Sequence, residues 1–112
     1  MNFDSLCKYL REKPGAYEDF PFGPSAMVFK VRDKMFALIA VRETPLRINL
    51  KCDPELALHL RAAYSAVQPG YHMNKKHWNT ITMDGSIPDE EIITMVNDSY
   101  DLVTKAKGEI DE

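Results

Sequence analysis

The sequence predicts an α+β fold, a single compact domain with a mainly antiparallel sheet and with helices on one side. Three observations support this prediction: apolar residues recur at helical spacing near both ends of the chain, short segments rich in β-branched and aromatic residues lie between them, and the connections are short. The expected element order is α-β-β-β-α-β-α. A chain of 112 residues buries one core but not two. We therefore take residues 1–112 as one domain, with 107–112 as a frayed tail.

The first helix is predicted over residues 3–13, because Phe3, Leu6 and Leu10 follow helical spacing and a Pro-Gly pair ends the pattern. The segment 16–25 that follows is irregular. Its phenylalanines are expected to hold the loop against the core.

Three strands are expected next. Residues 26–31 and 35–41 are apolar and often β-branched or aromatic, and the polar residues between them predict a hairpin. Its tip, Arg32-Asp33-Lys34, carries two cations. A third strand is predicted over 46–52, where apolar and polar residues alternate strictly. We expect one face of this strand to be buried and the other to be basic, with Arg47, Asn49 and Lys51 as a phosphate-facing strip or simply as the wet side of the sheet.

Asp53 and Pro54 predict the start of a second helix, because the aspartate side chain caps free N–H groups and proline suits the first helical position. This helix is expected to run to about Val67. Four of its residues are expected to face the core: Leu56, Leu60, Ala63 and Val67. A fourth strand is predicted over 78–83.

A last helix is predicted after Pro88, with three acidic residues in its first turn, where they favour the positive end of the helix dipole. Its expected core-facing stripe consists of Ile92, Val96, Ser99 and Val103. Residues 84–112 carry nine acidic and two basic residues, whereas residues 44–83 carry two acidic and five basic ones. The acid is thus concentrated in one helix, and the other faces are free to present a mildly positive surface.

Residues 69–78, Pro-Gly-Tyr-His-Met-Asn-Lys-Lys-His-Trp, combine cations with aromatic rings, and no acidic residue lies between Glu55 and Asp84. A flexible connection favours Gly, Ser and Asp, so we expect part of this segment to be ordered against the body of the protein or against a ligand. Trp78 is suited to stack on an unpaired base while nearby lysines contact phosphates. The competing interpretation is that Trp78 covers the sheet edge and that the lysines are only solvated.

No residue pattern indicates catalysis, so we expect a non-enzymatic protein that needs no cofactor and no metal. His72 and His77 have no third metal ligand near them in the sequence. Cys7 and Cys52 lack a basic motif that marks a nucleophile, and we expect both to be reduced and buried. An enzyme that uses one of the two histidines as acid or base is the third-ranked alternative.

The sequence also predicts the cellular location of the protein. No window approaches the roughly 20 apolar residues of a membrane span, and the N-terminus lacks the apolar region and cleavage site of a signal peptide. We expect a cytoplasmic monomer without membrane contact.

Several segments together carry a resemblance to a known family: Lys13-Pro14-Gly15-Ala16, Pro21-Phe22-Gly23, Leu50-Lys51-Cys52-Asp53-Pro54-Glu55, residues 69–79, Asp84-Gly85 and Ser99-Tyr100-Asp101-Leu102-Val103. In this order they closely resemble the MmcQ/YjbR family of small bacterial proteins, from about Phe3 to Val103. The resemblance implies a CyaY-like (frataxin-like) fold and proteins described as DNA-binding through a double wing of hairpin elements. It implies no known catalytic activity or cofactor.

On this resemblance, the wings are the Arg32-Asp33-Lys34 tip and the segment around residues 72–78. The candidate nucleic-acid-binding residues are Lys30, Arg32, Lys34, Arg47, Lys51, His72, Lys75, Lys76, His77 and Trp78. We expect DNA binding to be weak, salt-sensitive and mostly non-specific, and an exposed acidic last helix would repel the duplex unless it lies on the opposite face. The alternative function is a protein- or small-ligand-binding module with an amphipathic pocket formed by Tyr71, His72, Trp78 and Tyr100.

Overall fold

Six strands form one antiparallel sheet in the computed structural model, which describes residues 1–105. The predicted frayed tail, 107–112, lies outside the described residues. The strands are β1 (Tyr17–Asp19), β2 (Ala26–Val31), β3 (Lys34–Ala40), β4 (Arg47–Lys51), β5 (Val67–Pro69) and β6 (Trp78–Thr82). Their order across the sheet is β1-β2-β3-β4-β6-β5, and every neighbouring pair is antiparallel. With three helices, this arrangement confirms the predicted α+β fold class.

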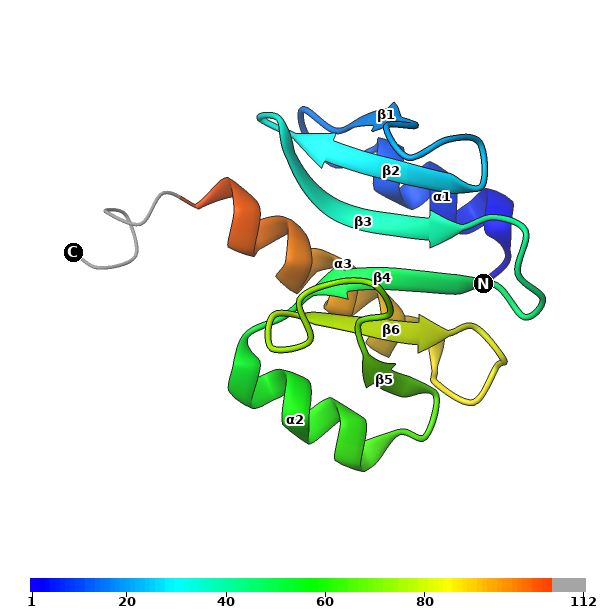
Figure 1. Cartoon of the computed structure of the whole chain (residues 1–112), viewed down its shortest axis with the longest axis vertical. Helices are drawn as coiled ribbons and strands as arrows, with labels where there is room; N and C mark the ends of the chain where they lie inside the picture. Colours follow the sequence, from blue (N-terminus) through cyan, green and yellow to red (C-terminus); the bar gives the residue numbers. More distant parts are fainter. Residues whose placement is uncertain (106–112) are drawn as a thin grey trace.

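The helices are α1 (Phe3–Arg11), α2 (Pro54–Ala63) and α3 (Asp89–Thr104). Figure 1 shows α1 and α3 behind the sheet, with α2 beyond the edge strand β5. The helix-covered face of the sheet is the hydrophobic core. Several of its strand residues are at most 1 % exposed, among them Phe29, Ile39, Ile48 and Ile81.

The stripe predicted for α3 is confirmed, because Ile92, Val96, Ser99 and Val103 are all buried. Ser99 is a polar member of this stripe, and its hydroxyl group explains its presence. Ser99 Oγ donates to the carbonyl of Phe36 on β3 and accepts from the backbone N–H of Lys51 on β4. One small side chain thus ties α3 to two strands at the centre of the sheet.

The start of α2 matches the sequence prediction, since the carboxylate of Asp53 accepts from the backbone N–H groups of Glu55 and Leu56. The predicted end of α2 is wrong, and its predicted buried face is confirmed only in part, because Leu60 packs against the core and Val67 is buried but Leu56 and Ala63 are exposed. The helix stops at Ala63, and Ala57 is fully buried while Leu56 is 37 % exposed. The reason is its place at the β5 edge, where only a narrow side of the helix meets the sheet and where Val67 continues as a strand.

Two three-residue edge strands, β1 and β5, add to the four predicted strands. Three residues are too few for an alternating pattern to show in a sequence. They become strands because the neighbouring strand is in place: Glu18 pairs with Phe29, and Val67 pairs with Ile81. These additions widen the sheet without changing the predicted order of the main elements.

Both cysteines, Cys7 and Cys52, are free and buried, as predicted. Within residues 1–105, no helix combines the length and the apolar composition that crossing a bilayer requires.

Candidate functional site

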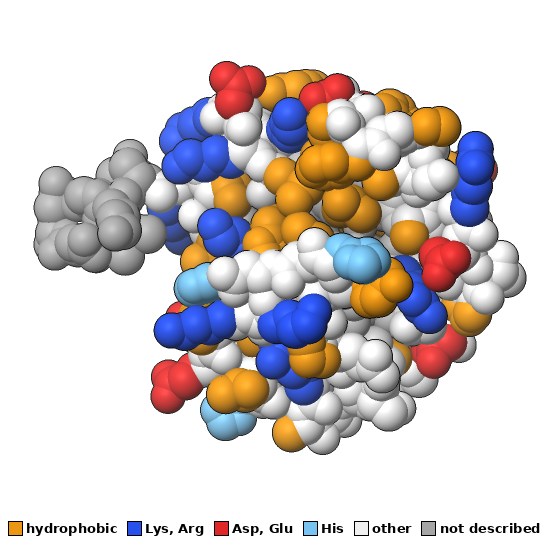
Figure 2. Space-filling model, viewed as in Figure 1, with side chains coloured by type: hydrophobic (Ala, Val, Ile, Leu, Met, Phe, Trp, Pro, Cys, Tyr) orange, Lys and Arg blue, Asp and Glu red, His pale blue; other side chains and the backbone are white. Residues whose placement is uncertain are grey.

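Within residues 1–105, no helix covers the face of the sheet opposite α1 and α3, here called the open face (Figure 1). Side chains alternate between the two faces of a strand. On β4, Ile48 and Leu50 therefore point to the core, while Arg47, Asn49 and Lys51 belong to the open face. Figure 2 looks onto this face and shows apolar side chains across its middle with Lys and Arg side chains around them.

A first hollow of about 350 Å³ lies on the open face between two overhanging connections. Phe22 comes from the connection between β1 and β2, and Tyr71, His72 and Met73 come from the connection between β5 and β6. Strand residues complete the lining: Ala26, Met35, Leu38, Ala40 and Asn49. The hollow is mainly apolar and has the size of a small-ligand pocket.

A second hollow of about 320 Å³ continues the first, because both share Ala40, Asn49 and Tyr71. Its remaining lining is polar and includes Ser25, Arg42, Glu43, Arg47 and Thr80. We call the two hollows together the trough. It follows β3 from an apolar end at Met35 to a polar end beyond Ala40.

Two buried polar residues, Asn49 and Thr80, form one wall of the trough. They face each other across β4 and β6, and the Thr80 hydroxyl donates to the Asn49 side-chain oxygen. The same hydroxyl accepts from the backbone N–H of Tyr71 at 2.9 Å. This pair therefore fixes the position of Tyr71, whose side chain is 63 % exposed at the rim.

The segment 70–77, here called the basic loop, folds back over the open face (Figure 1). A Cβ atom at Gly70 would lie 2.8 Å from the Cβ of Trp78, so the close approach requires glycine at this position. His72 has a φ of +58°, and its ring stacks on Tyr71 with 4.0 Å between centroids. The predicted ordering of this loop against the body is confirmed.

Arg61 on α2 holds the basic loop from behind. Its guanidinium donates to the Asn79 side-chain oxygen at 2.7 Å and also to the carbonyls of Lys75 and Trp78. Within the loop, the Asn74 side chain accepts from the N–H groups of Lys76 and His77. These hydrogen bonds hold in place the loop backbone from which Lys75 and Lys76 extend.

Both predicted wings lie at the same end of the sheet. The first wing is a two-residue turn, Arg32 and Asp33, with φ of +53° and +63°. Lys34 begins β3, and Lys51, the last residue of β4, pairs with Trp78, the first residue of β6. We call this the basic end, and it consists of Arg32, Lys34, Lys51, Lys75 and Lys76.

The candidate cations differ in what they contact. Lys30 forms an ion pair with Asp19 at 3.0 Å, which raises the pKa of Lys30 and lowers that of Asp19, and Arg47 pairs with Glu43 at 3.4 Å. At the basic end, backbone carbonyls accept from Arg32 and Lys75, at Thr104 and Gly70 respectively. Within the described residues, Lys34, Lys51 and Lys76 make no ion pair. Among the described residues, Lys34, Lys51 and Lys76 are therefore the cations of the basic end best placed to meet an anion, whereas Arg32 is directed to the end of α3 and Lys75 to the basic loop itself.

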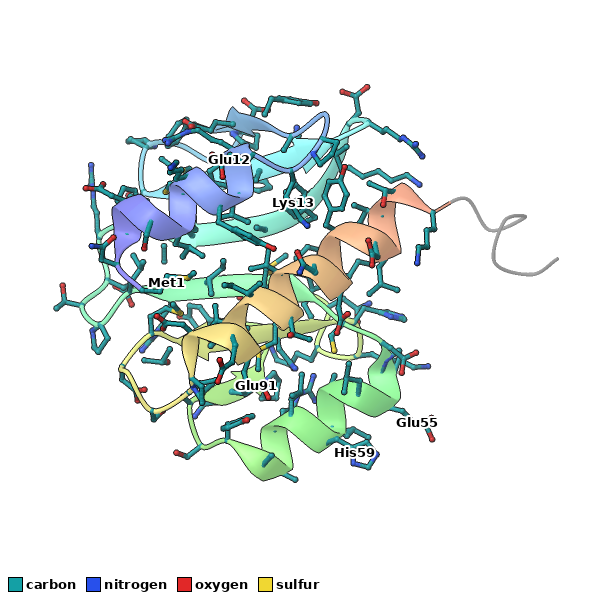
Figure 3. All side chains as sticks on the ribbon, turned by 180° about the vertical axis from the view of Figure 1, so that it is seen from behind. Met1, Glu12, Lys13, Glu55, His59 and Glu91 are labelled. Carbon is teal, nitrogen blue, oxygen red and sulfur yellow. The ribbon has the colours of Figure 1, made fainter. Side chains whose placement is uncertain are left out.

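The acidic helix α3 lies on the other face of the sheet. Figure 3 views that side and labels Glu91 on α3, whose first turn carries three acidic residues, whereas α1 beside it carries Lys8 and Arg11. The acidic residues behind the sheet are therefore concentrated in α3.

Two of the aromatic residues predicted to form a pocket, Trp78 and Tyr100, lie outside the trough. Trp78 is half-buried on β6 beside the basic loop and lines neither hollow. Tyr100 stands on α3, across the sheet, where its ring meets the edge of Phe36 and its hydroxyl donates to the Pro14 carbonyl. A pocket that combines Tyr71, His72, Trp78 and Tyr100 is therefore not formed. The sheet separates Tyr100 from the other three.

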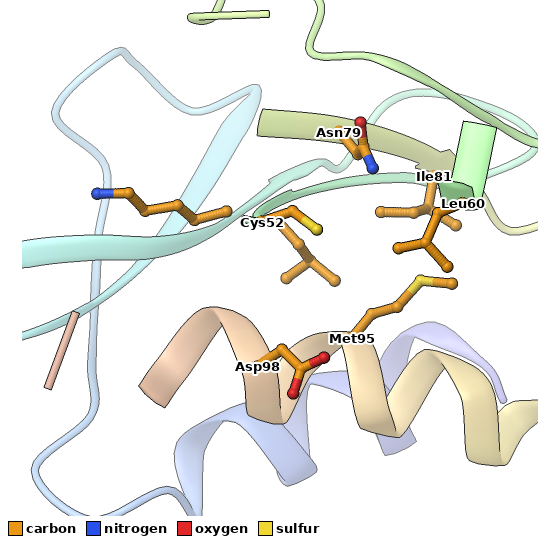
Figure 4. A pocket seen from close by; sticks show the side chains of 8 residues that line it. Cys52, Leu60, Asn79, Ile81, Met95 and Asp98 are labelled. Carbon is orange, nitrogen blue, oxygen red and sulfur yellow. The ribbon is translucent and has the colours of Figure 1, made fainter. Parts of the chain in front are cut away.

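A separate cavity lies between α2, α3 and the core face of the sheet (Figure 4), and Cys52, Asn79 and Asp98 line it. Its volume of about 10 Å³ suits one water molecule and no organic ligand. Burial raises the pKa of the Cys52 thiol to about 11 and also raises the pKa of Asp98. A thiol with this pKa is protonated at neutral pH and is a poor nucleophile.

The sequence analysis missed the residues that make the trough: Phe22, Leu38, Asn49 as a buried wall, and Thr80. One signal was present, since Asn49 interrupts the basic face of a strand whose neighbours are Arg47 and Lys51. Recognising its partner Thr80 requires the register between β4 and β6.

Comparison with known proteins identifies relatives of the whole domain. The YjbR family model matches residues 11–102. The uncharacterised protein YjbR of Escherichia coli K12 is 40 % identical over 100 residues, which cover 89 % of this chain and 85 % of that protein. The uncharacterised protein YyaQ of Bacillus subtilis is 29 % identical, covering 88 % and 95 %.

Two solved structures are also similar. The crystal structure of the Deinococcus radiodurans protein DR2400, with a DUF419 domain, has a TM-score of 0.89 and 43 % identity, and the match covers 95 % of this chain and 83 % of that one. A crystal structure of a Pseudomonas syringae protein has a TM-score of 0.78 and 31 % identity, covering 91 % and 98 %.

Proposed function

The chain belongs to the YjbR family, and we propose that it is a non-enzymatic nucleic-acid-binding protein that uses the basic end and the open face of its sheet. One observation carries the proposal. The two wings and Lys51 gather five cations at a single end of the sheet, while the acidic helix α3 lies behind it. This separation of charge favours approach of a polyanion to one face.

The contacts at the basic end fit phosphate groups better than base edges. Lysine ammonium groups are point charges that suit phosphate oxygens without reading sequence. In the described part of the chain, no helix lies on the open face in a position to enter a groove of duplex DNA. The proposed binding is therefore weak and mostly non-specific.

Salt dependence follows from the number of phosphates neutralised. Each phosphate contact contributes about −0.7 to the slope of log K against log salt for a single strand and about −0.9 for duplex DNA. Three to five such contacts would lower affinity by roughly ten- to a thousandfold between about 50 and 200 mM salt.

The test is a titration followed by the fluorescence of Trp78, the single tryptophan, beside the basic loop. Short DNA is added at about 50 and 200 mM salt. Lys76→Ala is compared with Lys8→Ala, because both lysines are exposed and each variant removes one charge, but Lys8 lies on α1 behind the sheet. We expect Lys76→Ala to weaken binding and lower the salt slope by about 1, and Lys8→Ala to change neither.

Absence of binding at low salt contradicts this proposal. Equal weakening by Lys76→Ala and Lys8→Ala contradicts the assignment to the basic end, because general attraction to the protein would then suffice.

A second candidate is a small-ligand or peptide site in the trough, favoured by its apolar floor at Met35 and Leu38. This candidate differs in its response to salt, since apolar contacts hardly depend on ionic strength. Binding that is unchanged between low and high salt would favour it. For either candidate, we propose a monomeric protein that acts in the cytoplasm.

A further inference from the structure

The trough adjoins the basic end, and the phosphate contacts proposed for the basic end do not involve the residues that line the trough. Its apolar end reaches Met35, the second residue of β3, immediately after Lys34 of the basic end. The rings of Phe22 and Tyr71, from two different connections, stand at its rim and are 66 % and 63 % exposed. Exposed apolar rings around a hollow of this size are unusual unless they meet a partner.

We propose that the trough takes unpaired bases of a single-stranded nucleic acid whose phosphates lie on the basic end. This inference rests on the proposed function and specifies its substrate class. Bases are flat, apolar on their faces and attached to a charged backbone. The trough offers the same combination in complementary form, with rings and an apolar floor beside Lys34, Lys51 and Lys76.

The dimensions agree with several nucleotides. The two hollows have volumes of about 350 and 320 Å³, of which the first follows β3 from Met35 to Ala40 and the second continues from Ala40 to Arg47 at the start of β4. The seven residues of β3 span roughly 23 Å at about 3.3 Å per residue. Folds that bind single strands on a sheet use a comparable arrangement, with aromatic side chains for stacking and a basic groove for the backbone.

A duplex fits this surface poorly. Its bases are stacked inside the helix, and a protein reaches them only with an element that enters a groove. The rings of the trough instead surround a recessed floor formed by Leu38 and its neighbours. Duplex DNA therefore meets only the phosphate contacts of the basic end, whereas a single strand gains stacking in addition.

Binding in the trough is expected to tolerate many sequences. The polar wall has few free hydrogen-bonding groups, because the Thr80 hydroxyl already donates to Asn49 and accepts from Tyr71. The Asn49 amide nitrogen donates to the Leu38 carbonyl at 3.4 Å. Stacking on exposed rings, which every base provides, is then the main source of affinity.

The experiment compares an oligothymidylate of about 15 nucleotides, within the site sizes of single-strand-binding folds, with a duplex that carries the same number of phosphates. Affinities are measured by fluorescence anisotropy of labelled DNA for the wild type, Phe22→Ala, Tyr71→Ala and Lys76→Ala. Phe20→Ala is the matched control, because Phe20 is 44 % exposed and lies outside the trough. Both rim side chains are exposed, so their removal leaves the core intact.

The wild type is expected to prefer the single strand. Phe22→Ala and Tyr71→Ala should each weaken single-strand binding on the order of tenfold to a hundredfold, the range of base-aromatic stacking, and leave duplex binding unchanged. Phe20→Ala should change neither affinity, and Lys76→Ala should weaken both.

Two results overturn the inference in different ways. If the ring variants bind the single strand as the wild type does, while Lys76→Ala still weakens binding, then the trough assignment is wrong and the proposed function stands. If neither nucleic acid binds at low salt, then the inference and the proposed function fail together.

Discussion

The two faces of the sheet are built from the same strands and serve different purposes. On the helix-covered face, Ile39, Ile48 and Ile81 are at most 1 % exposed and belong to the core cluster together with buried residues of α1 and α3. On the open face, their neighbours Leu38 and Ala40 remain partly exposed and line a hollow. Val28, opposite Leu38 on the same face, is fully buried. The open face is therefore partly packed and partly exposed, whereas the helix-covered face is packed throughout its centre.

The largest expected effect contrasts Ile48→Ala with Leu38→Ala. Ile48 is fully buried beneath the helices, so its truncation should lower the free energy of unfolding by about 2–5 kcal/mol, through lost burial and a cavity. Leu38 borders an open hollow, and its truncation should cost roughly 1 kcal/mol or less. Urea denaturation measures both. Equal losses would show that the open face is as much a core as the other.

The unfolding free energy, measured at increasing alkaline pH, should report the burial of Cys52 behind the sheet. Burial raises the pKa of this thiol from an ordinary value of 9.0 to about 11 in the folded protein. The stabilisation by the protonated thiol is present below pH 9 and is lost as the pH rises from about 9 to 11. We expect the loss to reach up to about 3 kcal/mol.

The control for this titration is Cys52→Ala. The variant lacks the titrating thiol, so its unfolding free energy should fall less steeply over the same pH range. Parallel curves for the two proteins would mean that the Cys52 thiol ionises equally easily in the folded and unfolded states.

A smaller effect tests the polar wall of the open face. Thr80→Val removes the hydroxyl that joins Asn49 to the backbone of Tyr71, and it should cost about 1–2 kcal/mol of unfolding free energy. Thr82→Val is the control, because Thr82 lies two residues along on the same face of β6. The backbone amide signal of Tyr71 should shift in Thr80→Val and stay in place in Thr82→Val. No shift in either variant would show that this pair does not position the rim.

The fold was largely predictable because its signals are local. The stripe of α3 shows helical spacing, β4 alternates over consecutive residues, and Asp53 carries a capping side chain. The end of α2 was not predictable from spacing alone, because Val67 suits a helix and a strand equally and its pairing with Ile81 decides the outcome.

The candidate site was predictable in part. The basic loop was evident from its composition, and its position at the end of the sheet beside Lys51 follows from the strand order. The trough was not evident, because Phe22, Leu38 and Thr80 come from three distant segments that only the register of the sheet brings together. Tyr100 was assigned to the wrong side for the same reason.

The most direct test of the account is a map of backbone amide shifts in the ¹⁵N-labelled protein during titration with a short oligothymidylate at low salt. The account predicts that shifts concentrate on the open face and the basic end, at Leu38, Asn49, Lys51, Tyr71 and Lys76, and that amides of α1 and α3 stay in place. Shifts confined to α1 and α3, or none at saturating oligothymidylate, would contradict the claim that the open face binds unpaired bases.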